Sequence, residues 1–295
     1  MKKICISGCG DIGQRVAKRF LNQPLLSKSD ISVYGLVRRA EVQTELQALG
    51  ITPVIADLDQ PDTLKALACK DAVLFHLAPP PNSGQSDPRF RNLLAACEQT
   101  GLPAKVILLS TTAVYGDCQG KWIDETAPVN PQTDRGKRRL DAESALREWA
   151  IKHDIEYVIL RVSGIYGPGR LPIERLQQGL PILREDLAPF SNRIHQDDLA
   201  MVCVAAAEKA PNGAIYNVCD GHPSTMSHYF KSVARALDLP SPPEIDQDQA
   251  QQQLSVGMLS YLSESRRMGN QKLLTELGIT LQYPDLAAGL ANLQS

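Results

Sequence analysis

The sequence predicts an α/β fold, in which a doubly wound parallel sheet is joined to a smaller C-terminal lobe. Two observations carry this prediction. Short apolar runs alternate with stretches of helical spacing through the first half of the chain, which is the pattern of repeated βαβ units. A glycine-rich turn directly follows the first apolar run, as at the ligand-binding edge of parallel sheets. Right-handed crossovers then place helices on both faces of the sheet.

Seven segments are predicted to be buried strands, because each is short, apolar and bounded by turn residues. In chain order they are Lys3–Ser7, Ile31–Val37, Thr52–Ala56, Ala72–Ala78, Lys105–Ser110, Glu156–Arg161 and Ile215–Val218. Beyond them, turn strings such as YGPGR precede an amphipathic stretch at Asp198–Lys209. The segment Pro240–Gln253, rich in Pro, Asp and Gln, is expected to be either an exposed connection or a polar helix.

A chain of 295 residues has room for two such lobes. We expect residues 1–165, joined by about 194–222, to form a dinucleotide-binding core, and 166–193 with 223–295 to form a substrate lobe. The 31 basic and 33 acidic side chains leave a net charge of −2, so no nucleic-acid partner is expected. No run approaches the roughly 20 apolar residues of a membrane span, and no secretory signal is recognisable, so a cytoplasmic protein is expected.

The seven cysteines are scattered and lack metal-ligand spacing, so neither a disulfide framework nor a metal site is predicted. Most are expected to be small core residues. Cys9 differs because it lies inside the glycine turn. Backbone amides there could lower the pKa of its thiol and allow a redox role.

The glycine turn has the spacing of a dinucleotide-binding loop of the Rossmann type, since a strand leads into it and a helical pattern follows. Gly8 would permit the tight turn, Gly10 would let the backbone approach a pyrophosphate, and Gly13 would let helix and strand pack closely. The positive end of the helix would face the phosphates. The predicted cofactor residues in this loop are Gly8, Gly10, Asp11, Ile12 and Gly13.

Two arginines at the end of the second strand indicate which dinucleotide binds. Enzymes that use NAD place an acidic side chain there, on the 2′-hydroxyl of the ribose. This chain has Arg38 and Arg39 instead, and guanidinium groups favour a 2′-phosphate. A contact of about 1.5–3 kcal/mol corresponds to roughly a tenfold to hundredfold preference. NADP is therefore the preferred cofactor, with NAD possible; the alternative is that both arginines are solvated surface charges.

Further strings carry a resemblance to a known family. They are STTAVYG at 110–116, DETAP at 124–128, LR at 160–161, YGPG at 166–169, IHQDD at 194–198 and YNVC at 216–219. Through them, nearly the whole chain resembles the NAD-dependent epimerase/dehydratase family of extended and atypical short-chain dehydrogenases/reductases. It is most similar to the YeeZ-like bacterial branch.

The resemblance implies additional cofactor contacts. Asp57 and Leu58, after the third strand, would lie at the adenine, while Ala78 and Pro79, after the fourth, would border the ribose and pyrophosphate. Both pairs follow strand ends, where a doubly wound sheet binds its ligands. A helix or turn cap is the alternative role for Asp57.

The resemblance also implies a catalytic centre, where this chain departs from the family. The family uses a tyrosine as general acid/base, a lysine four residues later and an upstream Ser or Thr that hydrogen-bonds the reacting oxygen. Thr111 fits the last role, but Arg135 stands at the tyrosine position and Arg139 at the lysine position. A guanidinium does not exchange protons near neutral pH, and a lost proton carrier costs roughly 10²–10⁴ in rate. Arg139 could still hold ribose hydroxyls or a phosphate.

Other side chains are candidates to move the proton or to hold an anion. Lys137 is the best substitute base if it is desolvated, and a solvated helix start is the alternative. The further proton candidates, for which structural roles are the alternative, are Tyr115, Tyr166 and His195. The candidates for a substrate carboxylate or phosphate are Arg161, Arg170, Arg175 and Arg193, of which Arg161 is expected to be a buried ion-pair partner and Arg193 to serve the substrate lobe.

Two functions follow from these residues. The favoured hypothesis is an NAD(P)-dependent oxidoreductase or epimerase that acts on a hydroxyl or carbonyl of a sugar-like or other small polar substrate. The alternative is a catalytically inactive NADP(H)-binding sensor or scaffold. The resemblance also makes a homodimer possible, with the helix expected at Arg138–Lys152 in the interface.

Overall fold

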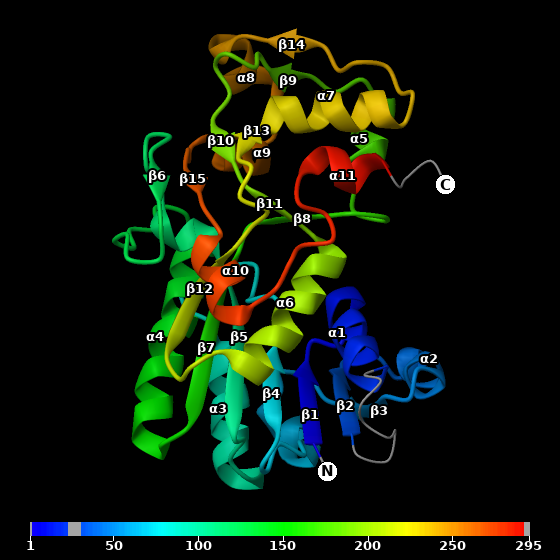
Figure 1. The fold of residues 1–295 in the computed structure, drawn as a ribbon, viewed down its shortest axis with the longest axis vertical. Coiled ribbons are helices and arrows are strands. Elements are labelled where there is room, and N and C mark those ends of the chain that lie inside the picture. Colours follow the sequence, from blue (N-terminus) through cyan, green and yellow to red (C-terminus); the bar gives the residue numbers. More distant parts are fainter. Residues whose placement is uncertain (1, 23–30, 292–295) are drawn as a thin grey trace. The chain divides into compact units, whose positions relative to one another are not determined.

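The computed structural model describes residues 2–22 and 31–291 and confirms the α/β fold (Figure 1). Its largest element is a seven-stranded sheet in the order β12-β7-β5-β4-β1-β2-β3, the order of a doubly wound sheet. The strands are β1 Lys2–Ser7, β2 Ile31–Val37, β3 Thr52–Ile55, β4 Val73–His76, β5 Lys105–Thr111, β7 Glu156–Val162 and β12 Ala214–Val218. All seven predicted strands are present, with ends that differ from the prediction by at most two residues.

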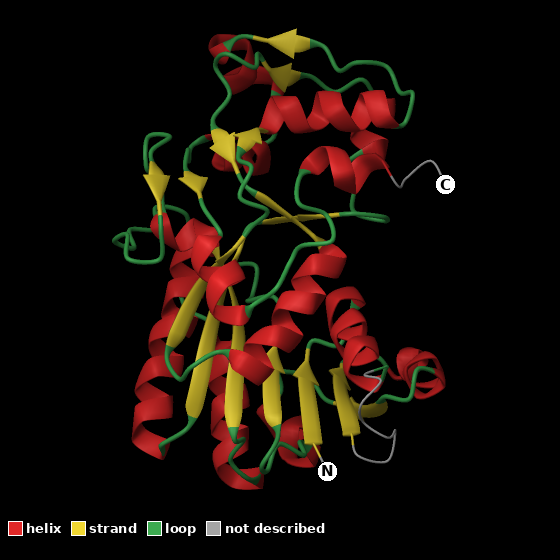
Figure 2. Ribbon diagram, viewed as in Figure 1, coloured by secondary structure: helices red, strands yellow, loops and turns green. Residues whose placement is uncertain are grey.

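Helices cover both faces of this sheet because successive strand residues point to opposite sides (Figure 2). Cys5 and Leu74 belong to the buried cluster that α3 and α4 complete on one face. On the other face Phe75 meets Phe20 of α1, with ring centroids 5.9 Å apart. The helical elements around the sheet are α1 Asp11–Leu21, η2 Ala40–Val42, α2 Gln43–Ala48, η3 Pro61–Ala66, α3 Pro88–Thr100, η4 Thr112–Tyr115, α4 Asp134–His153 and α6 Gln196–Lys209.

The chain divides into two compact units. Unit 1 contains Met1–Val114, Asp134–Arg161 and Leu199–Tyr216, and unit 2 contains Tyr115–Thr133, Val162–Asp198 and Asn217–Ser295. Residues 115–133, which the sequence placed with the core, lie with unit 2 because β6 in this segment pairs with β15. The division of the chain into a cofactor domain and a substrate domain at the predicted boundaries stays a proposal.

Unit 2 is built from short strands and helices rather than from one large sheet. Its elements are β6 Trp122–Ile123, β8 Gly164–Tyr166, α5 Ile173–Gln177, β9 Ile182–Leu183, β10 Phe190–Ser191, β11 Arg193–His195, β13 Ser224–Thr225, α7 Met226–Ala236, β14 Glu244–Ile245, α8 Gln247–Gln253, α9 Val256–Leu262, β15 Arg267–Met268, α10 Gln271–Leu277 and α11 Leu286–Ala291. Of the two alternatives for 240–253, the polar helix forms at 247–253, where Asp246 and Gln249 make a capping box. No helix in residues 2–22 or 31–291 has the length and apolar character to cross a membrane.

A buried ion pair joins α4 to β7 inside unit 1. Glu143 is fully buried and accepts hydrogen bonds from Arg161 Nη2 at 2.8 Å and Nε at 3.1 Å. Ser110, near the end of β5, donates to the same carboxylate at 2.6 Å. Arg161 is only 3% exposed, so its expected role as a buried ion-pair partner is confirmed. The carboxylate therefore ties two strands and one helix together.

Removal of the Glu143 charge is expected to destabilise the protein strongly. A Glu143→Gln variant keeps the shape of the side chain but removes the buried negative charge that faces Arg161, which should lower the free energy of unfolding by about 3–5 kcal/mol. Urea unfolding measures this loss. Glu98→Gln is the matched control, because Glu98 is 37% exposed beside His153 and should cost no more than about 1 kcal/mol. Equal losses in the two variants would contradict the role assigned to Glu143.

Candidate functional site

The three glycines of the loop after β1 have three different surroundings. At Gly8, which has φ of +87°, an added Cβ would lie 2.5 Å from the Ala78 nitrogen. At Gly13 it would lie 2.9 Å from the Gly8 carbonyl oxygen, so α1 packs against the loop. At Gly10 it would meet nothing within 4 Å. Only the Gly10 position therefore faces open space, as a backbone cradle for a ligand requires.

The same loop lies where the strand order reverses, between β1 and β4. Leu77 and Ala78 both donate their backbone N–H to the Ser7 carbonyl oxygen, at 2.8 and 3.1 Å. Cys9 N–H donates to Leu36 O at 3.1 Å and so ties the loop to β2. Gly10 caps the N-terminus of α1 without a side-chain hydrogen bond, which leaves the first N–H groups of an 11-residue helix for an anion. The residues present therefore fit a dinucleotide pyrophosphate.

The two arginines predicted to select the cofactor follow β2 on the surface. Arg38 and Arg39 are both exposed. The pKa of Asp59 is lowered by its hydrogen bond from Arg89 and, to a smaller extent, by the charge of Arg38. Arg38 is thus within electrostatic reach of the loop after β3. The same loop carries the predicted adenine residues Asp57 and Leu58.

Asp57 forms two hydrogen bonds that stabilise this loop. Its Oδ1 accepts the Asp59 N–H at 3.0 Å, which closes an Asx turn, and Thr63 Oγ1 accepts the Asp57 N–H at 2.9 Å. The turn cap named as the alternative role is therefore present, and any contact with adenine would be additional to it. The Leu58 side chain is buried, and its carbonyl oxygen accepts from Asn92 at 2.8 Å.

The residue at the lysine position, Arg139, points at the loop after β4. Its Nη2 donates to Ala78 O at 3.1 Å, and its Nη1 lies 3.8 Å from Asp87 Oδ2. Burial lowers the pKa of Arg139 to about 10, which keeps it charged at neutral pH. Next to it, Arg138 donates to Gly84 O at 2.7 Å. The start of α4 therefore clamps the segment that carries Ala78 and Pro79.

A buried polar cluster that sequence reasoning missed lies behind this clamp. His76, fully buried at the end of β4, is 3.3 Å from Ser7 Oγ through Nδ1 and packs on the Phe90 ring. Burial, and then the charge of Arg139, hold the pKa of His76 well below its usual value, so the ring is neutral at pH 7. Asp87 caps α3 by accepting the Phe90 N–H at 3.1 Å. The Asp-Pro pair at 87–88 is a helix-start signal that could have revealed this cap.

The predicted catalytic side chains lie at the end of β5 and in the first turn of α4. Thr111 ends β5, is half-buried, and accepts the Ala113 N–H at 3.3 Å, which leaves its own O–H as a donor. Arg135 and Lys137 are half-buried in the first turn of α4. Unit 1 thus contains Thr111, Arg135, Lys137 and Arg139 on the two elements that the resemblance implied.

Cys9 does not have the environment of a reactive thiol. It is 2% exposed, and an added Cβ on Gly35 would lie 2.8 Å from its Sγ. Burial raises the pKa of Cys9 to about 12. The expectation of a lowered pKa in the glycine turn was wrong, because the side chain points into the core between β1 and β2 rather than toward the helix N-terminus.

The three predicted proton carriers outside α4 form hydrogen bonds within unit 2. Tyr115 donates to Asn217 Oδ1 at 2.7 Å, and Tyr166 donates to Asp285 O at 3.1 Å. His195 accepts the Asp197 N–H at 3.2 Å, and its ring centroid lies 3.7 Å from that of Tyr283. These contacts support the structural roles named as the alternative.

Asp220 is a buried carboxyl whose pKa is raised by burial to about 6 from 3.8. Because the folded state holds this proton more tightly than the unfolded chain, stability falls as pH rises from about 4 to about 6. Relative to Asp220→Asn, the unmodified protein should lose up to about 3 kcal/mol of unfolding free energy over this interval. Urea unfolding at several pH values measures it. Exposed Asp238→Asn is the control and should keep the original profile; parallel profiles for Asp220→Asn would contradict the raised pKa.

Comparison with known proteins places these features in a family. The profile of the NAD dependent epimerase/dehydratase family matches residues 4–219. Protein YeeZ of Escherichia coli K12 is 28% identical over 297 residues, which cover 97% of each chain. A ketoreductase of Stigmatella aurantiaca that acts on 4-hydroxy-2-methyl-3-oxo-4-farnesyl-3,4-dihydroquinoline-1-oxide is 26% identical over 247 residues, 78% of this chain and 71% of that one.

A solved structure is similar to this chain over its whole length. The structure of a functionally unknown conserved protein from Silicibacter pomeroyi matches with a TM-score of 0.80 at 28% identity, and covers 100% of this chain and 98% of that chain. The resemblance inferred from the motifs is thereby confirmed. The chain belongs to the NAD-dependent epimerase/dehydratase family.

Proposed function

We propose that the protein is an NADP(H)-dependent oxidoreductase or epimerase that acts on a hydroxyl or carbonyl of a sugar-like or other small polar substrate. The observation that carries this proposal is the open space at Gly10, beside an uncapped helix N-terminus and at the point where the strand order reverses. A glycine turn that served only to pack strand against helix would have no need of that space. The family to which the chain belongs is described as NAD dependent, which supports a dinucleotide at this loop.

The preference for NADP rests on the charges around the end of β2. Arg38 and Arg39 bring two guanidinium groups to this edge. The carboxylate that Arg38 influences, Asp59, is already paired with Arg89 at 2.6 Å. Arg89 thus neutralises Asp59, and Arg38 and Arg39 remain to favour a 2′-phosphate.

Parallel calorimetric titration with NADPH and NADH tests the cofactor proposal. We expect NADPH to bind roughly tenfold to hundredfold more tightly, and the difference to vanish in Arg38→Ala/Arg39→Ala because the charge-assisted contact is lost. Arg184→Ala is a control for the loss of a surface arginine, since Arg184 belongs to unit 2 and is paired with Asp186 at 2.7 Å. Failure of both dinucleotides to bind would overturn the function, whereas equal binding of the two would overturn only the NADP preference.

The residues near the cofactor loop suggest how the reaction would be supported. When bound, the dinucleotide supplies the hydride chemistry, and the protein aligns the reacting groups. Thr111 would donate its O–H to the reacting oxygen, and Lys137 or a water would carry the proton. Arg135 does not replace the family tyrosine, because a guanidinium keeps its protons near neutral pH. Arg139 would act indirectly by holding the Ala78 loop.

A second function is favoured by one specific observation. The Nη2 group of Arg139 is already used by Ala78 O, and the guanidinium faces Asp87 at 3.8 Å, although its Nη1 has no hydrogen-bond partner in the described structure, so at least part of the side chain serves the protein rather than a ligand ribose. A protein that binds NADP(H) without turnover, as a sensor or scaffold, would have this arrangement. The two functions share the cofactor site and differ only in whether a proton carrier operates.

Restoration of the family residues distinguishes the two functions. If the site has lost catalysis, Arg135→Tyr/Arg139→Lys should create NADPH oxidation with generic carbonyl compounds where the unmodified protein has none. The gain should reach roughly 10²-fold or more, the worth of a positioned proton carrier. Arg135→Tyr alone is the control, because it leaves the buried Arg139 contacts intact. Turnover by the unmodified protein that is lost in Lys137→Met would instead support the enzyme.

A further inference from the structure

Arg89, in the first turn of α3, binds two loops of unit 1 at once. Its Nε and Nη2 donate to the two carboxylate oxygens of Asp59, in the loop after β3, at 2.8 and 2.6 Å. Its Nη1 donates to the carbonyl oxygens of Pro79 and Pro80, in the loop after β4, at 3.2 and 3.3 Å. All three nitrogens of the guanidinium are therefore used. The two loops share one rigid, planar group.

The two loops follow strands that are not neighbours in the sheet. In the order β4-β1-β2-β3, two strands lie between β4 and β3, and the glycine turn follows one of them, β1. The hydrogen bonds of the sheet therefore fix each loop only where its strand ends, and the side chain of Arg89 adds a direct connection between the loops. A dinucleotide bound to a doubly wound sheet extends across such strand ends.

The surroundings of Arg89 hold its guanidinium in one place. A pair in which two N–H groups bind one carboxylate fixes the orientation as well as the position of the group. The Arg89 side chain is 19% exposed, whereas that of Arg91 on the same helix is 50% exposed. The hydrogen bond with Asp59 raises the pKa of Arg89. Asn92, three residues later and thus on the same face of α3, donates to Leu58 O at 2.8 Å. The loop after β3 is therefore held to α3 at two points.

We propose that Arg89 is a positioning residue for the dinucleotide, because it sets the spacing between the loops after β3 and β4 on the two sides of the glycine turn. This inference rests on the proposed function and adds a residue that no motif of the sequence indicated. Without Arg89, the loops would have to be ordered when the dinucleotide binds, which costs affinity. The effect is the same for NADPH and NADH, because the two molecules differ only in the 2′-phosphate.

Arg91 makes the same kind of carboxylate pair without contacting either loop. Within the described residues, its side-chain hydrogen bonds go to Asp141 of α4 alone, from Nη2 at 2.6 Å and from Nε at 3.3 Å. Arg91 therefore serves as a matched control for the loss of an arginine–carboxylate pair on α3.

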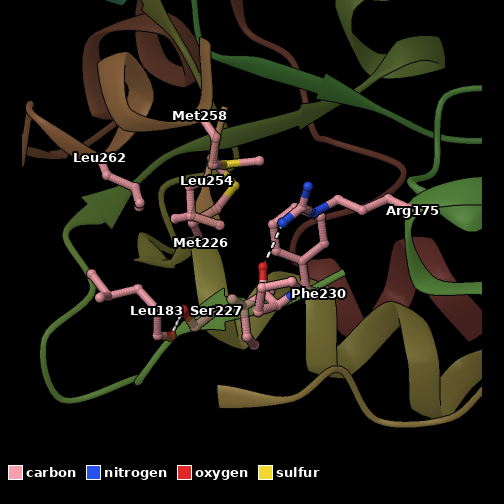
Figure 3. A pocket seen from close by; sticks show the side chains of 10 residues that line it. Arg175, Leu183, Met226, Ser227, Phe230, Leu254, Met258 and Leu262 are labelled. Carbon is pink, nitrogen blue, oxygen red and sulfur yellow. Dashed lines mark hydrogen bonds between the residues drawn. The ribbon is translucent and has the colours of Figure 1, made fainter. Parts of the chain in front are cut away.

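Arg175 of α5 makes the other kind of contact, with a proline carbonyl (Figure 3). Its Nη2 donates to Pro181 O, and its Cζ lies 5.4 Å from the centroid of the Phe230 ring. The cavity beside it, lined in part by Leu254 and Met258, has a volume of about 10 Å³. A cavity of this size holds one water molecule, so Arg175 has no room for a substrate anion. Since Arg175 belongs to unit 2 and the glycine turn to unit 1, it is a second control.

Calorimetric titration with NADPH and with NADH tests the role of Arg89. Arg89→Met should weaken the binding of both dinucleotides about tenfold, the effect of losing one charge-assisted contact. The ratio of the two affinities should stay that of the unmodified protein, because Arg38 and Arg39 are untouched. Arg89→Lys keeps the charge without the planar fork and should weaken both several-fold. Arg91→Met and Arg175→Met should bind both dinucleotides as the unmodified protein does.

Unchanged affinity in Arg89→Met would overturn the positioning role, and so would full affinity in Arg89→Lys, since the charge alone would then suffice. Loss of NADPH binding alone would also overturn it, because Arg89 would then act on the 2′-phosphate. Each of these results leaves the proposed function intact, whereas failure of the unmodified protein to bind either dinucleotide would overturn both. Urea unfolding controls for folding. Similar midpoints are expected for Arg89→Met and Arg91→Met, because each variant loses one carboxylate pair near the surface.

Discussion

The close approach of the loops after β1 and β4 is the constraint on which the rest of unit 1 depends. Gly8 leaves no room for a side chain, since a Cβ would lie 2.5 Å from Ala78 N. The Ser7 carbonyl oxygen accepts two N–H groups from the β4 loop, so the two strand ends are held together by backbone atoms. That contact determines where α1 begins. It leaves Gly10 as the position at which the loop meets open space.

The start of α4 reinforces the same contact from the other side of the loop. At the two positions of this helix where the family resemblance implied a tyrosine and a lysine, the chain has Arg135 and Arg139. Arg139 donates to the Ala78 carbonyl oxygen, and its neighbour Arg138 donates to Gly84 O, so the helix holds the β4 loop. Arg139 therefore has a positioning role in the fold, whatever its part in the proposed reaction.

Buried charges are treated differently in the two units. In unit 1, Glu143 neutralises Arg161 with two hydrogen bonds, and the pair serves to hold helix and strand together. In unit 2, Arg193 has a hydroxyl, a thioether and an aromatic face as neighbours. At similar burial, the first arginine is therefore held by a carboxylate and the second by neutral groups.

Much of unit 1 could be predicted from the sequence because its signals are local. The apolar runs of the strands and the spacing of Gly8, Gly10 and Gly13 act over a few residues, and each is present in the structure as predicted. The motif strings likewise identified the family. The arginine pair after β2 was visible for the same reason, since its position depends only on where one strand ends.

Other features were decided by contacts between residues far apart in the chain. Arg139 is 61 residues from Ala78, and no spacing rule indicates that its side chain turns toward that carbonyl oxygen. The burial of Cys9 depends on Gly35 of the neighbouring strand, so its raised pKa could not be foreseen from the glycine turn alone. The partners of Arg193 come from β13 and α7. The sequence by itself determined the sheet, the glycine turn after β1 and the family, because periodicity and spacing are local. Only the tertiary structure decided which charged side chains are paired, because their partners are brought together by folding.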